Sequence, residues 1–359
     1  MIRTFIINSY LCKEFLKIMM LVSLVFFGLG LIINLFEEIN FFKDYDVGIY
    51  LPVFLSFLYV PSLFYNMFPF IILFSGMWFF LNIKETDEVT ALKISGMSNF
   101  SIIIAPSILV IFLGIFYIAA INPITSVLVK KYEKTKGNFE KDQDYLASIT
   151  ANGIWIKEKN NIIRSSKLSD NNLIDVSIYE FDVNNNFIKR FEADSANISS
   201  QLWILKNVKV INEDGKVIQE DLSEVTYKSI YDIEKIKRLY SNLDTVSFWE
   251  LKNEIRLLEN RGYSTSEMRS KMQQSIAFPF SLLSMIFLSG VIALGFNLKN
   301  NNWNYVFIGV ISSVSIFYFN RFSAALGKTE ELPIEVSVWM PIIIILILSV
   351  VGLIHANQK

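Results

Sequence analysis

Side chains that could do covalent or acid–base chemistry are scarce in this chain of 359 residues. His355 is the sole histidine and Cys12 the sole cysteine. A lone histidine excludes multi-histidine metal sites and most Ser/His/Asp arrangements, and a lone cysteine excludes an internal disulfide. We expect no cofactor and no enzyme activity. The formal net charge of -1 also provides no basic field for nucleic acid.

One short segment has the pattern of a capped helix that a partner could hold. Thr86 is expected to cap this helix, with Asp87 and Glu88 in its positive first turn. Lys93 lies near its end, and Gly96 terminates it. Such a helix, lying across the mouth of a membrane bundle, can sit in a cleft of a soluble partner and transmit movement. The alternative is an ordinary solvated loop helix.

The sequence lacks the phosphate-cradling loop of ATPases. Gly215-Lys216 and Gly327-Lys328 are its Gly-Lys pairs, and both lack the earlier glycine that the loop requires. Aspartate and glutamate are nearly absent from the interiors of the predicted membrane spans, which argues against a proton relay. If ATP powers transport here, the ATPase is a separate polypeptide.

A cluster of lysines follows the third long apolar run. Lys130, Lys131 and Lys134, together with Lys43, could form a basic rim that suits the phosphate groups of a lipid. A solvated polar collar is the alternative. Aromatic side chains in the spans would suit acyl chains, although such side chains usually face lipid or the core. The candidate lipid-binding residues are Lys43, Lys130, Lys131, Met67 and Phe68.

Membrane spans must position these residues. The chain is 52% hydrophobic and 19% charged, whereas soluble domains are nearer one quarter charged. Lys and Arg before the first span (Arg3, Lys13 and Lys17) and Lys299 between spans four and five predict that both termini are cytoplasmic. Runs long enough to cross a bilayer occur near residues 15–36, 51–81, 101–122, 276–297, 303–323 and 337–354.

The segment after the third span lies outside in this orientation and has a β pattern. Short strand-like runs over residues 155–211 are separated by turn signals at 184–186, and another follows at 214–215. We expect an antiparallel β-sandwich or jelly roll. In its last run the apolar residues share one parity, as in a half-buried strand: Leu202, Ile204, Val208 and Val210.

Two helices are expected to return the chain to the membrane. Ser247 and Glu250 form a capping-box pattern, and Gly262 ends the first helix. Ser264 with Glu267 begins the second helix, which should run into the fourth span. The predicted domains are an N-terminal transmembrane half (1–122, with a coupling helix at 86–96), a β jelly roll (123–246), connecting helices (247–275) and a C-terminal transmembrane half (276–359).

Five stretches, in this order and spacing, carry a family resemblance: Glu88–Gly96 (EVTALKISG), Gly153–Lys157 (GIWIK) followed by Asn160 and Asn161, Ser177–Phe181 (SIYEF), Leu332-Pro333, and Trp339-Met340-Pro341. The chain resembles the YjgP/YjgQ permeases, the paired membrane subunits of the lipopolysaccharide export ABC transporter of Gram-negative bacteria. The resemblance covers essentially the whole chain. The second and third stretches favour the G paralogue of the family over the F paralogue.

The resemblance implies several partners and a cargo. A soluble ABC ATPase dimer (LptB) would grip the coupling helix, and a paralogous six-span permease (LptF) would complete the transmembrane cavity. A bitopic jelly-roll protein (LptC) would receive lipopolysaccharide that has been extracted from the inner membrane and passed through jelly rolls toward the outer membrane. The residues expected to meet the ATPase are Glu88, Asp87, Leu92 and Gly96.

The resemblance also bears on the lysines. Lys130 falls where the family places a basic residue just after the third span, for the phosphates of lipid A. The chain departs from the family at Asn34, where relatives can carry a lysine late in the first span. Lys43 is the nearest basic residue on that side.

Two other function classes remain open from the residues. A mechanotransmission permease would let an ATPase move an outside domain without any lipid crossing, but such permeases place that domain between the first two of four spans. An intramembrane enzyme is disfavoured because the lone His355 lies at the end of the last span and no aspartate pair occupies the span interiors.

Overall fold

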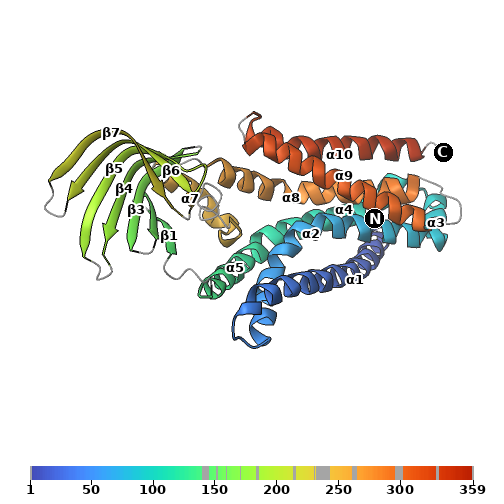
Figure 1. Cartoon of the computed structure of the whole chain (residues 1–359). Helices are drawn as coiled ribbons and strands as arrows, with labels where there is room; N and C mark the ends of the chain where they lie inside the picture. Colours follow the sequence, from blue (N-terminus) through green and yellow to red (C-terminus); the bar gives the residue numbers. More distant parts are fainter. Residues whose placement is uncertain are drawn as a thin grey trace. The chain divides into compact units, whose positions relative to one another are not determined.

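Two units make up the chain in a computed structural model (Figure 1). The helical unit comprises Met1–Tyr132, Thr245–Lys252 and Ser266–Lys359, and the β unit comprises Glu133–Asp244 and Asn253–Thr265. The structure describes residues 2–139, 145–150, 153–158, 160–169, 171–182, 186–212, 216–229, 231, 243–260, 265–295, 302–328 and 331–357. Lys299, Gly262, Ser264 and the turn signals at 184–185 and 214–215 lie outside the described residues.

Among the described residues, six helices are long and apolar enough to cross a membrane, which confirms the predicted number of spans. They are α1 (Ile2–Phe41), α2 (Tyr50–Glu85), α4 (Asn99–Phe116) continued by the π segment η2 (Tyr117–Ile121) and α5 (Asn122–Gly137), α8 (Ser266–Gly290) continued by the π segment η4 (Val291–Gly295), α9 (Asn302–Lys328) and α10 (Ile334–Asn357). Shorter elements are η1 (Phe42–Asp44), α3 (Glu88–Ile94), η3 (Leu243–Thr245) and α7 (Phe248–Glu259).

The first and third span helices continue into polar sequence beyond their predicted apolar runs. The first continues to Phe41, so that Glu38 lies on a helix and not in a loop, with only 1% of its surface exposed. The third continues from α4 through η2 into the polar α5. The two extensions meet, because Tyr132 Oη donates a hydrogen bond of 2.7 Å to Glu38 Oε1. This hydrogen bond pairs the polar groups of the two extensions, so that both helices can continue beyond their apolar runs.

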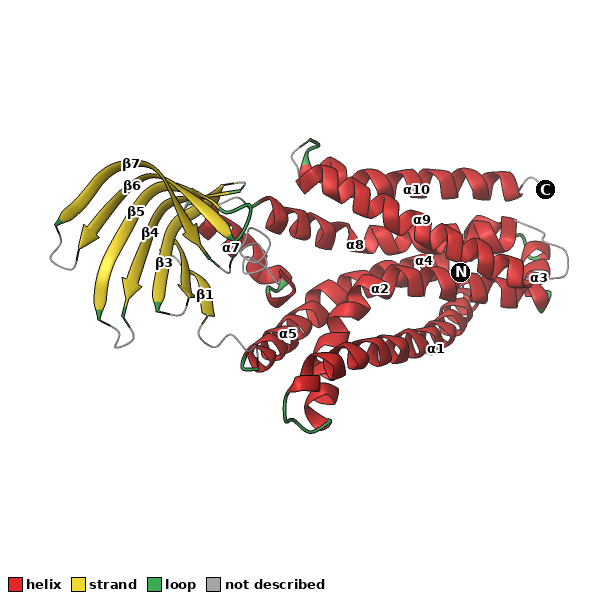
Figure 2. Cartoon of the chain, viewed as in Figure 1, coloured by secondary structure: helices red, strands yellow, loops and turns green. Residues whose placement is uncertain are grey.

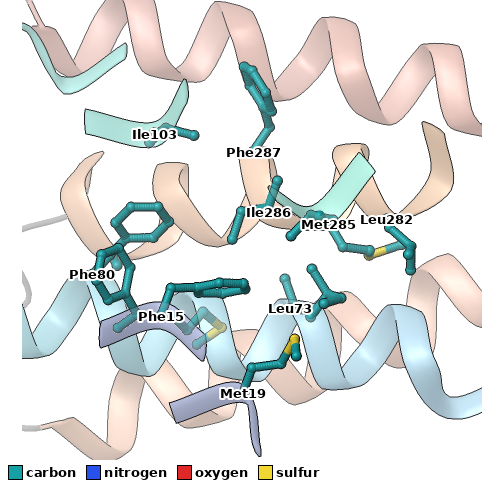
Figure 3. Close-up of a cluster of buried hydrophobic side chains, with 14 of the residues drawn as sticks. Phe15, Met19, Leu73, Phe80, Ile103, Leu282, Met285, Ile286 and Phe287 are labelled. Carbon is teal, nitrogen blue, oxygen red and sulfur yellow. The ribbon is translucent and has the colours of Figure 1, made fainter. Parts of the chain in front are cut away.

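The core of the helical unit forms around α8, which has the most buried apolar window of the six spans. Small residues let its neighbours approach closely. A Cβ added at Gly114 would lie 2.8 Å from the backbone of Pro279, and one at Gly76 would lie 2.8 Å from Ile286. Figure 3 shows the side chains that fill the space between α1, α2, α4 and α8: Phe15, Met19, Leu73, Phe80, Ile103, Leu282, Met285, Ile286 and Phe287.

The β unit is one antiparallel sheet of seven strands in chain order, inserted between the third and fourth spans. This confirms the predicted fold class and is consistent with a jelly-roll-like domain. The sheet is strongly curved (Figure 2). Its strands are β1 (Tyr145–Thr150), β2 (Gly153–Glu158), β3 (Asn161–Ser169), β4 (Asn172–Phe181), β5 (Phe187–Asn197), β6 (Leu202–Asn212) and β7 (Val217–Lys228).

The curvature brings together strands that are not neighbours in the sheet. Ser229, which follows β7, donates a 2.7 Å hydrogen bond to Glu158 at the end of β2. Asn161 on β3 donates a 2.8 Å hydrogen bond to the hydroxyl oxygen of Tyr227 on β7. Burial raises the pKa of Tyr227 to about 12. The sheet therefore folds over its own apolar face, where Trp203 is fully buried.

A polar row crosses the sheet and reverses which residues face the core. Asp175 on β4 and Asn207 on β6 have left-handed backbones, with φ of 50° and 54°, and Asn207 donates a 2.9 Å hydrogen bond to Asp194 on β5. On β6 the residues Trp203, Leu205, Val208 and Val210 are buried, whereas Leu202 and Ile204 are exposed. The predicted parity is thus wrong before Asn207 and right after it.

Candidate functional site

The predicted coupling helix exists as α3, but its start differs from the prediction. α3 begins at Glu88, and Asp87 precedes it with a left-handed backbone (φ 58°). Thr86 does not cap α3, because it is the last residue of the α2 turn and its hydroxyl donates to the carbonyl oxygen of Asn82 at 3.0 Å. The left-handed turn at Asp87 reverses the chain directly from α2 into α3.

The end of α3 is closed as predicted. Gly96 has φ +93°, which glycine adopts readily. Its N–H donates to the carbonyl oxygen of Lys93 at 2.9 Å, and the N–H of Met97 donates to that of Leu92 at 3.1 Å. This pair of bonds is a Schellman motif, which satisfies the last carbonyl groups of the helix.

α3 has one face on the bundle and one face away from it. Val89 is 8% exposed within the core, and Leu92 packs half-buried against it. Glu88 is half-buried and accepts hydrogen bonds from the hydroxyl of Tyr10 on α1. On the outer face Ile94 is 84% exposed. The arrangement holds the helix firmly and leaves an apolar side chain available to a partner.

A second contact secures the turn that leads from α2 into α3. Lys84, in the last turn of α2, donates a 3.1 Å hydrogen bond to the carbonyl oxygen of Ala293 in η4. Its ammonium group also lies 5.8 Å from the centre of the Tyr305 ring on α9. The turn that leads into α3 is therefore linked to the fourth and fifth spans, while Glu88 links α3 to the first. The C-terminal end of α10 lies at the same end of the unit as α3 (Figure 1).

The predicted basic rim is spread over two elements. Lys130 and Lys131 are exposed on α5, and Lys43 is exposed in η1, five residues after Glu38. The hydrogen bond between Glu38 and Tyr132 holds these two elements at one end of the helical unit. The Lys131 ammonium lies 5.2 Å from the centre of the Phe54 ring, a cation–π contact.

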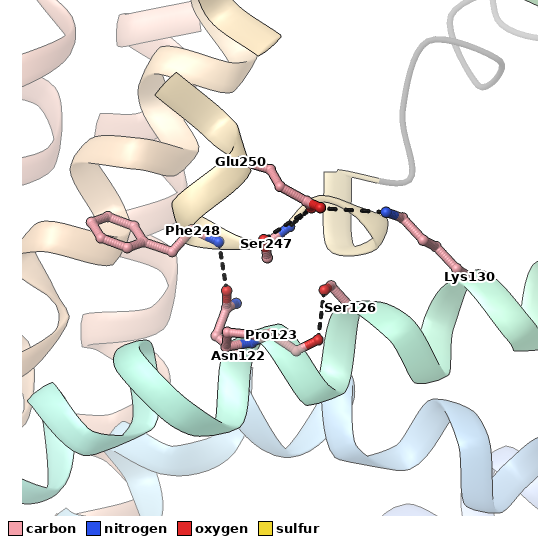
Figure 4. A network of polar contacts seen from close by, with 7 residues as sticks. All are labelled: Asn122, Pro123, Ser126, Lys130, Ser247, Phe248 and Glu250. Carbon is pink, nitrogen blue, oxygen red and sulfur yellow. Dashed lines mark hydrogen bonds and ion pairs between the residues drawn. The ribbon is translucent and has the colours of Figure 1, made fainter. Parts of the chain in front are cut away.

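Lys130 faces the first turn of α7 (Figure 4). Its Nζ lies 3.8 Å from Oε2 of Glu250. The same oxygen accepts a hydrogen bond from the backbone N–H of Ser247 (3.1 Å), as in the predicted capping box. It accepts a second hydrogen bond from the Ser247 hydroxyl (2.9 Å). The bonds from Ser247, and next the charge of Lys130, hold the pKa of the Glu250 carboxyl below its ordinary value.

Two further hydrogen bonds fasten α7 to the third span. The N–H of Phe248 donates to Oδ1 of Asn122 at 2.8 Å, and the indole N–H of Trp249 donates to the carbonyl oxygen of Ala119 at 3.2 Å. Ala119 lies in the π segment η2, a geometry that often marks functional positions. The sequence contains the capping box, but nothing in it predicts these partners from the distant third span.

Sequence reasoning missed a buried polar group beside the lysines. Glu38 and Asn34 are each 1% exposed and lie four residues apart on α1. The Tyr132 ring that donates to Glu38 stacks on Tyr59 at 4.8 Å between centroids. The i, i+4 spacing of two polar residues at the end of an apolar run was the available signal.

The apolar candidates lie inside the bundle. Phe68 is 7% exposed and packs against Tyr117 and Phe278, and Met67 is half-buried beside the same core. A separate pocket of about 290 Å³ is lined by Val22, Phe74, Met77, Trp78, Leu81, Asn82, Glu85 and Val306. Within the described part of the chain, no group of three potential metal-binding side chains occurs.

Comparison with known proteins agrees with this architecture. The model of the family described as lipopolysaccharide export system permease LptF/LptG matches residues 9–355. A relative is the lipopolysaccharide export system permease protein LptG of Haemophilus influenzae, which is 24% identical over 294 residues, 79% of this chain and 80% of the relative. The six spans, the inserted β unit and this match over nearly the whole chain agree. The chain belongs to the LptF/LptG family of lipopolysaccharide export system permeases.

Proposed function

We propose that this permease is the G-type subunit of an ABC exporter, which extracts lipopolysaccharide from the inner membrane and passes it through its β unit toward the outer membrane. The observation that carries the proposal is α3, a short helix held at both ends, with Ile94 84% exposed on its outer face. Such a helix suits a cleft of a soluble motor. Membership of a lipopolysaccharide export family supports the cargo.

A separate ATPase dimer, corresponding to LptB, would supply the energy through α3. Glu88 would meet the ATPase while Tyr10 holds its carboxylate in place. Asp87 and Gly96 set the two turns that aim the helix, and Leu92 anchors it to the core. Movement of α3 would reach the first span through Tyr10 and the fourth and fifth spans through Lys84. The subunit itself would have no catalytic role.

The lysines of η1 and α5 would receive the phosphate groups of the lipid. Lys130, Lys131 and Lys43 are all exposed, and ammonium groups bind phosphate as point charges. Met67 and Phe68 would meet acyl chains. Because Phe68 is only 7% exposed, that contact requires the helices around it to separate during transport.

Three spans precede the β unit and three follow it, so both termini lie on one side of the membrane and the β unit on the other. The lysines and arginines flanking the spans favour cytoplasmic termini and a periplasmic β unit. We propose a paralogous permease (LptF) as the second half of the cavity and a bitopic jelly-roll protein (LptC) as the next carrier. The division into 1–122, 123–246, 247–275 and 276–359 remains our proposal for the domains.

The test is to purify the tagged chain gently from its native membrane and identify what comes with it by mass spectrometry. The proposal expects a soluble ABC ATPase, a second six-span permease and lipopolysaccharide. An ATPase accompanied by a cell-wall hydrolase or an efflux protein would support mechanotransmission instead. Recovery of the permease pair without any ATPase would contradict the role proposed for α3.

A further inference from the structure

The ion pair between Lys130 and Glu250 is exposed to solvent, and another anion can replace its carboxylate. The two charged groups are 3.8 Å apart, and their side chains are 53% and 54% exposed. Exposed pairs of this kind contribute little to stability and are screened by salt. A phosphate group that reaches Lys130 can therefore replace the carboxylate.

Glu250 stays where it is when Lys130 leaves. Its carboxylate accepts two hydrogen bonds from Ser247 within the first turn of α7. That turn is fastened independently by the bond of Phe248 to Asn122 (Figure 4) and by the bond of Trp249 to Ala119. A fixed negative charge thus remains beside any anion that binds Lys130.

We propose that Glu250 is an internal competitor for the anion site at Lys130, which an incoming phosphate group of a lipid must displace. This inference rests on the lipid-phosphate role proposed for Lys130. Competition and charge repulsion act in the same direction, so the carboxylate lowers the affinity of Lys130 for phosphate. The coupling is reciprocal. A bound phosphate weakens the contact between Lys130 on α5 and Glu250 by the same factor by which that contact weakens phosphate binding.

Substitution of Glu250 by glutamine separates the charge from the helix cap. Glutamine also serves as the third residue of a capping box, so Glu250→Gln keeps the bond to Ser247 and removes the negative charge. One unit charge at about 4 Å in water alters a binding constant about fivefold. Glu250→Gln should therefore tighten phosphate binding about fivefold. Glu254→Gln, an exposed acid on the same helix, is the matched control.

The experiment uses the full chain in phosphatidylcholine nanodiscs titrated with dioctanoyl phosphatidic acid, with inorganic phosphate as a second arm. Thermophoresis gives the dissociation constants, and a zero-length carbodiimide crosslink reports the Lys130–Glu250 contact. Four variants are compared with the parent: Glu250→Gln, Glu254→Gln, Lys130→Ala and the double variant Lys130→Ala with Glu250→Gln.

The proposal expects phosphatidic acid to reduce the crosslink, Glu250→Gln to tighten binding, and that gain to vanish in the double variant. If Lys130→Ala weakens binding but Glu250→Gln leaves it unchanged, the competitor is refuted while the lipid-phosphate site stands. If Lys130→Ala has no effect, the lipid-phosphate site itself is wrong. Equal displacement by the same concentration of inorganic phosphate would refute a lipid ligand.

Discussion

Tyr10 on α1 donates its hydroxyl hydrogen to the carboxylate of Glu88 on α3, with both carboxylate oxygens 3.1 Å from the hydroxyl oxygen. This contact joins the start of the first span to a helix 78 residues away. It orients the acid that we propose meets the ATPase, and it gives α3 a direct connection to the first span.

Removing this hydroxyl should weaken the complex with the ATPase without unfolding the permease. For Tyr10→Phe we expect a loss of up to about tenfold in affinity, because a hydrogen bond to a charged group contributes about 1.5 kcal/mol. Glu88→Ala should lose more. The dissociation constants are measured with the permease in nanodiscs, and Tyr318→Phe, at an exposed site on α9, is the control. Normal binding by Tyr10→Phe alongside a Glu88→Ala defect would show that Tyr10 does not position the acid.

Adjacent positions on β6 test which residues face the core of the β unit. Trp203 is fully buried and Leu202 is 55% exposed. Trp203→Ala should cost about 3–5 kcal/mol, whereas Leu202→Ala should alter stability by at most about 0.5 kcal/mol. Hydrogen–deuterium exchange of β6 in the full chain measures both. A larger loss in Leu202→Ala would restore the parity predicted from sequence.

Hydrophobic run length was sufficient to predict the six spans, because a bilayer requires about 20 apolar residues whatever the partners of the helix. The parity of β6 was not predictable in the same way. The left-handed backbone at Asn207 and its bond to Asp194 on β5 reverse the alternation of buried and exposed residues. The local periodicity of a sequence does not predict how strands pair.

For the candidate sites too, local sequence patterns predicted single residues but not their distant contacts. Glu88, Gly96, Lys130 and Glu250 each stand out by local pattern. The contacts that these patterns do not predict join distant segments of the chain, as in the bonds from Tyr10 to Glu88 and from Tyr132 to Glu38. Such tertiary pairs also affect where an element ends: α1 continues beyond residue 36, where its apolar run ends, and carries the buried Glu38.

The bond between Tyr132 and Glu38 should stabilise the end of the helical unit. In Tyr132→Phe a buried carboxylate loses a 2.7 Å hydrogen bond, and we expect a loss of about 1–3 kcal/mol. Unfolding of the purified chain in detergent measures it, with Tyr50→Phe as an exposed control. In combination with Glu38→Gln the two losses should be less than additive. Strict additivity would mean that the residues act independently.

Acid should loosen the first turn of α7. Because hydrogen bonds from Ser247 keep the pKa of Glu250 below its ordinary value of 4.5 in the folded chain, the ionised carboxylate stabilises this turn fully above pH 4.5. That stabilisation is lost as the pH falls through the lower, folded-state pKa. Amide exchange of α7 between pH 7 and pH 3, corrected for intrinsic rates, should show loss of protection in the parent and in Glu254→Gln. If Glu250→Gln shows the same acid-dependent loss, another group is responsible.

ATP-driven release of lipopolysaccharide from proteoliposomes is the decisive test of the proposed export function. The proteoliposomes contain the chain with its ATPase and its second permease subunit. Release to a soluble jelly-roll acceptor is measured with labelled lipopolysaccharide, with and without ATP. We predict release that requires ATP and is abolished by Glu88→Ala while lipopolysaccharide still binds. Intact complexes that hydrolyse ATP and release no lipopolysaccharide would contradict the proposed export function.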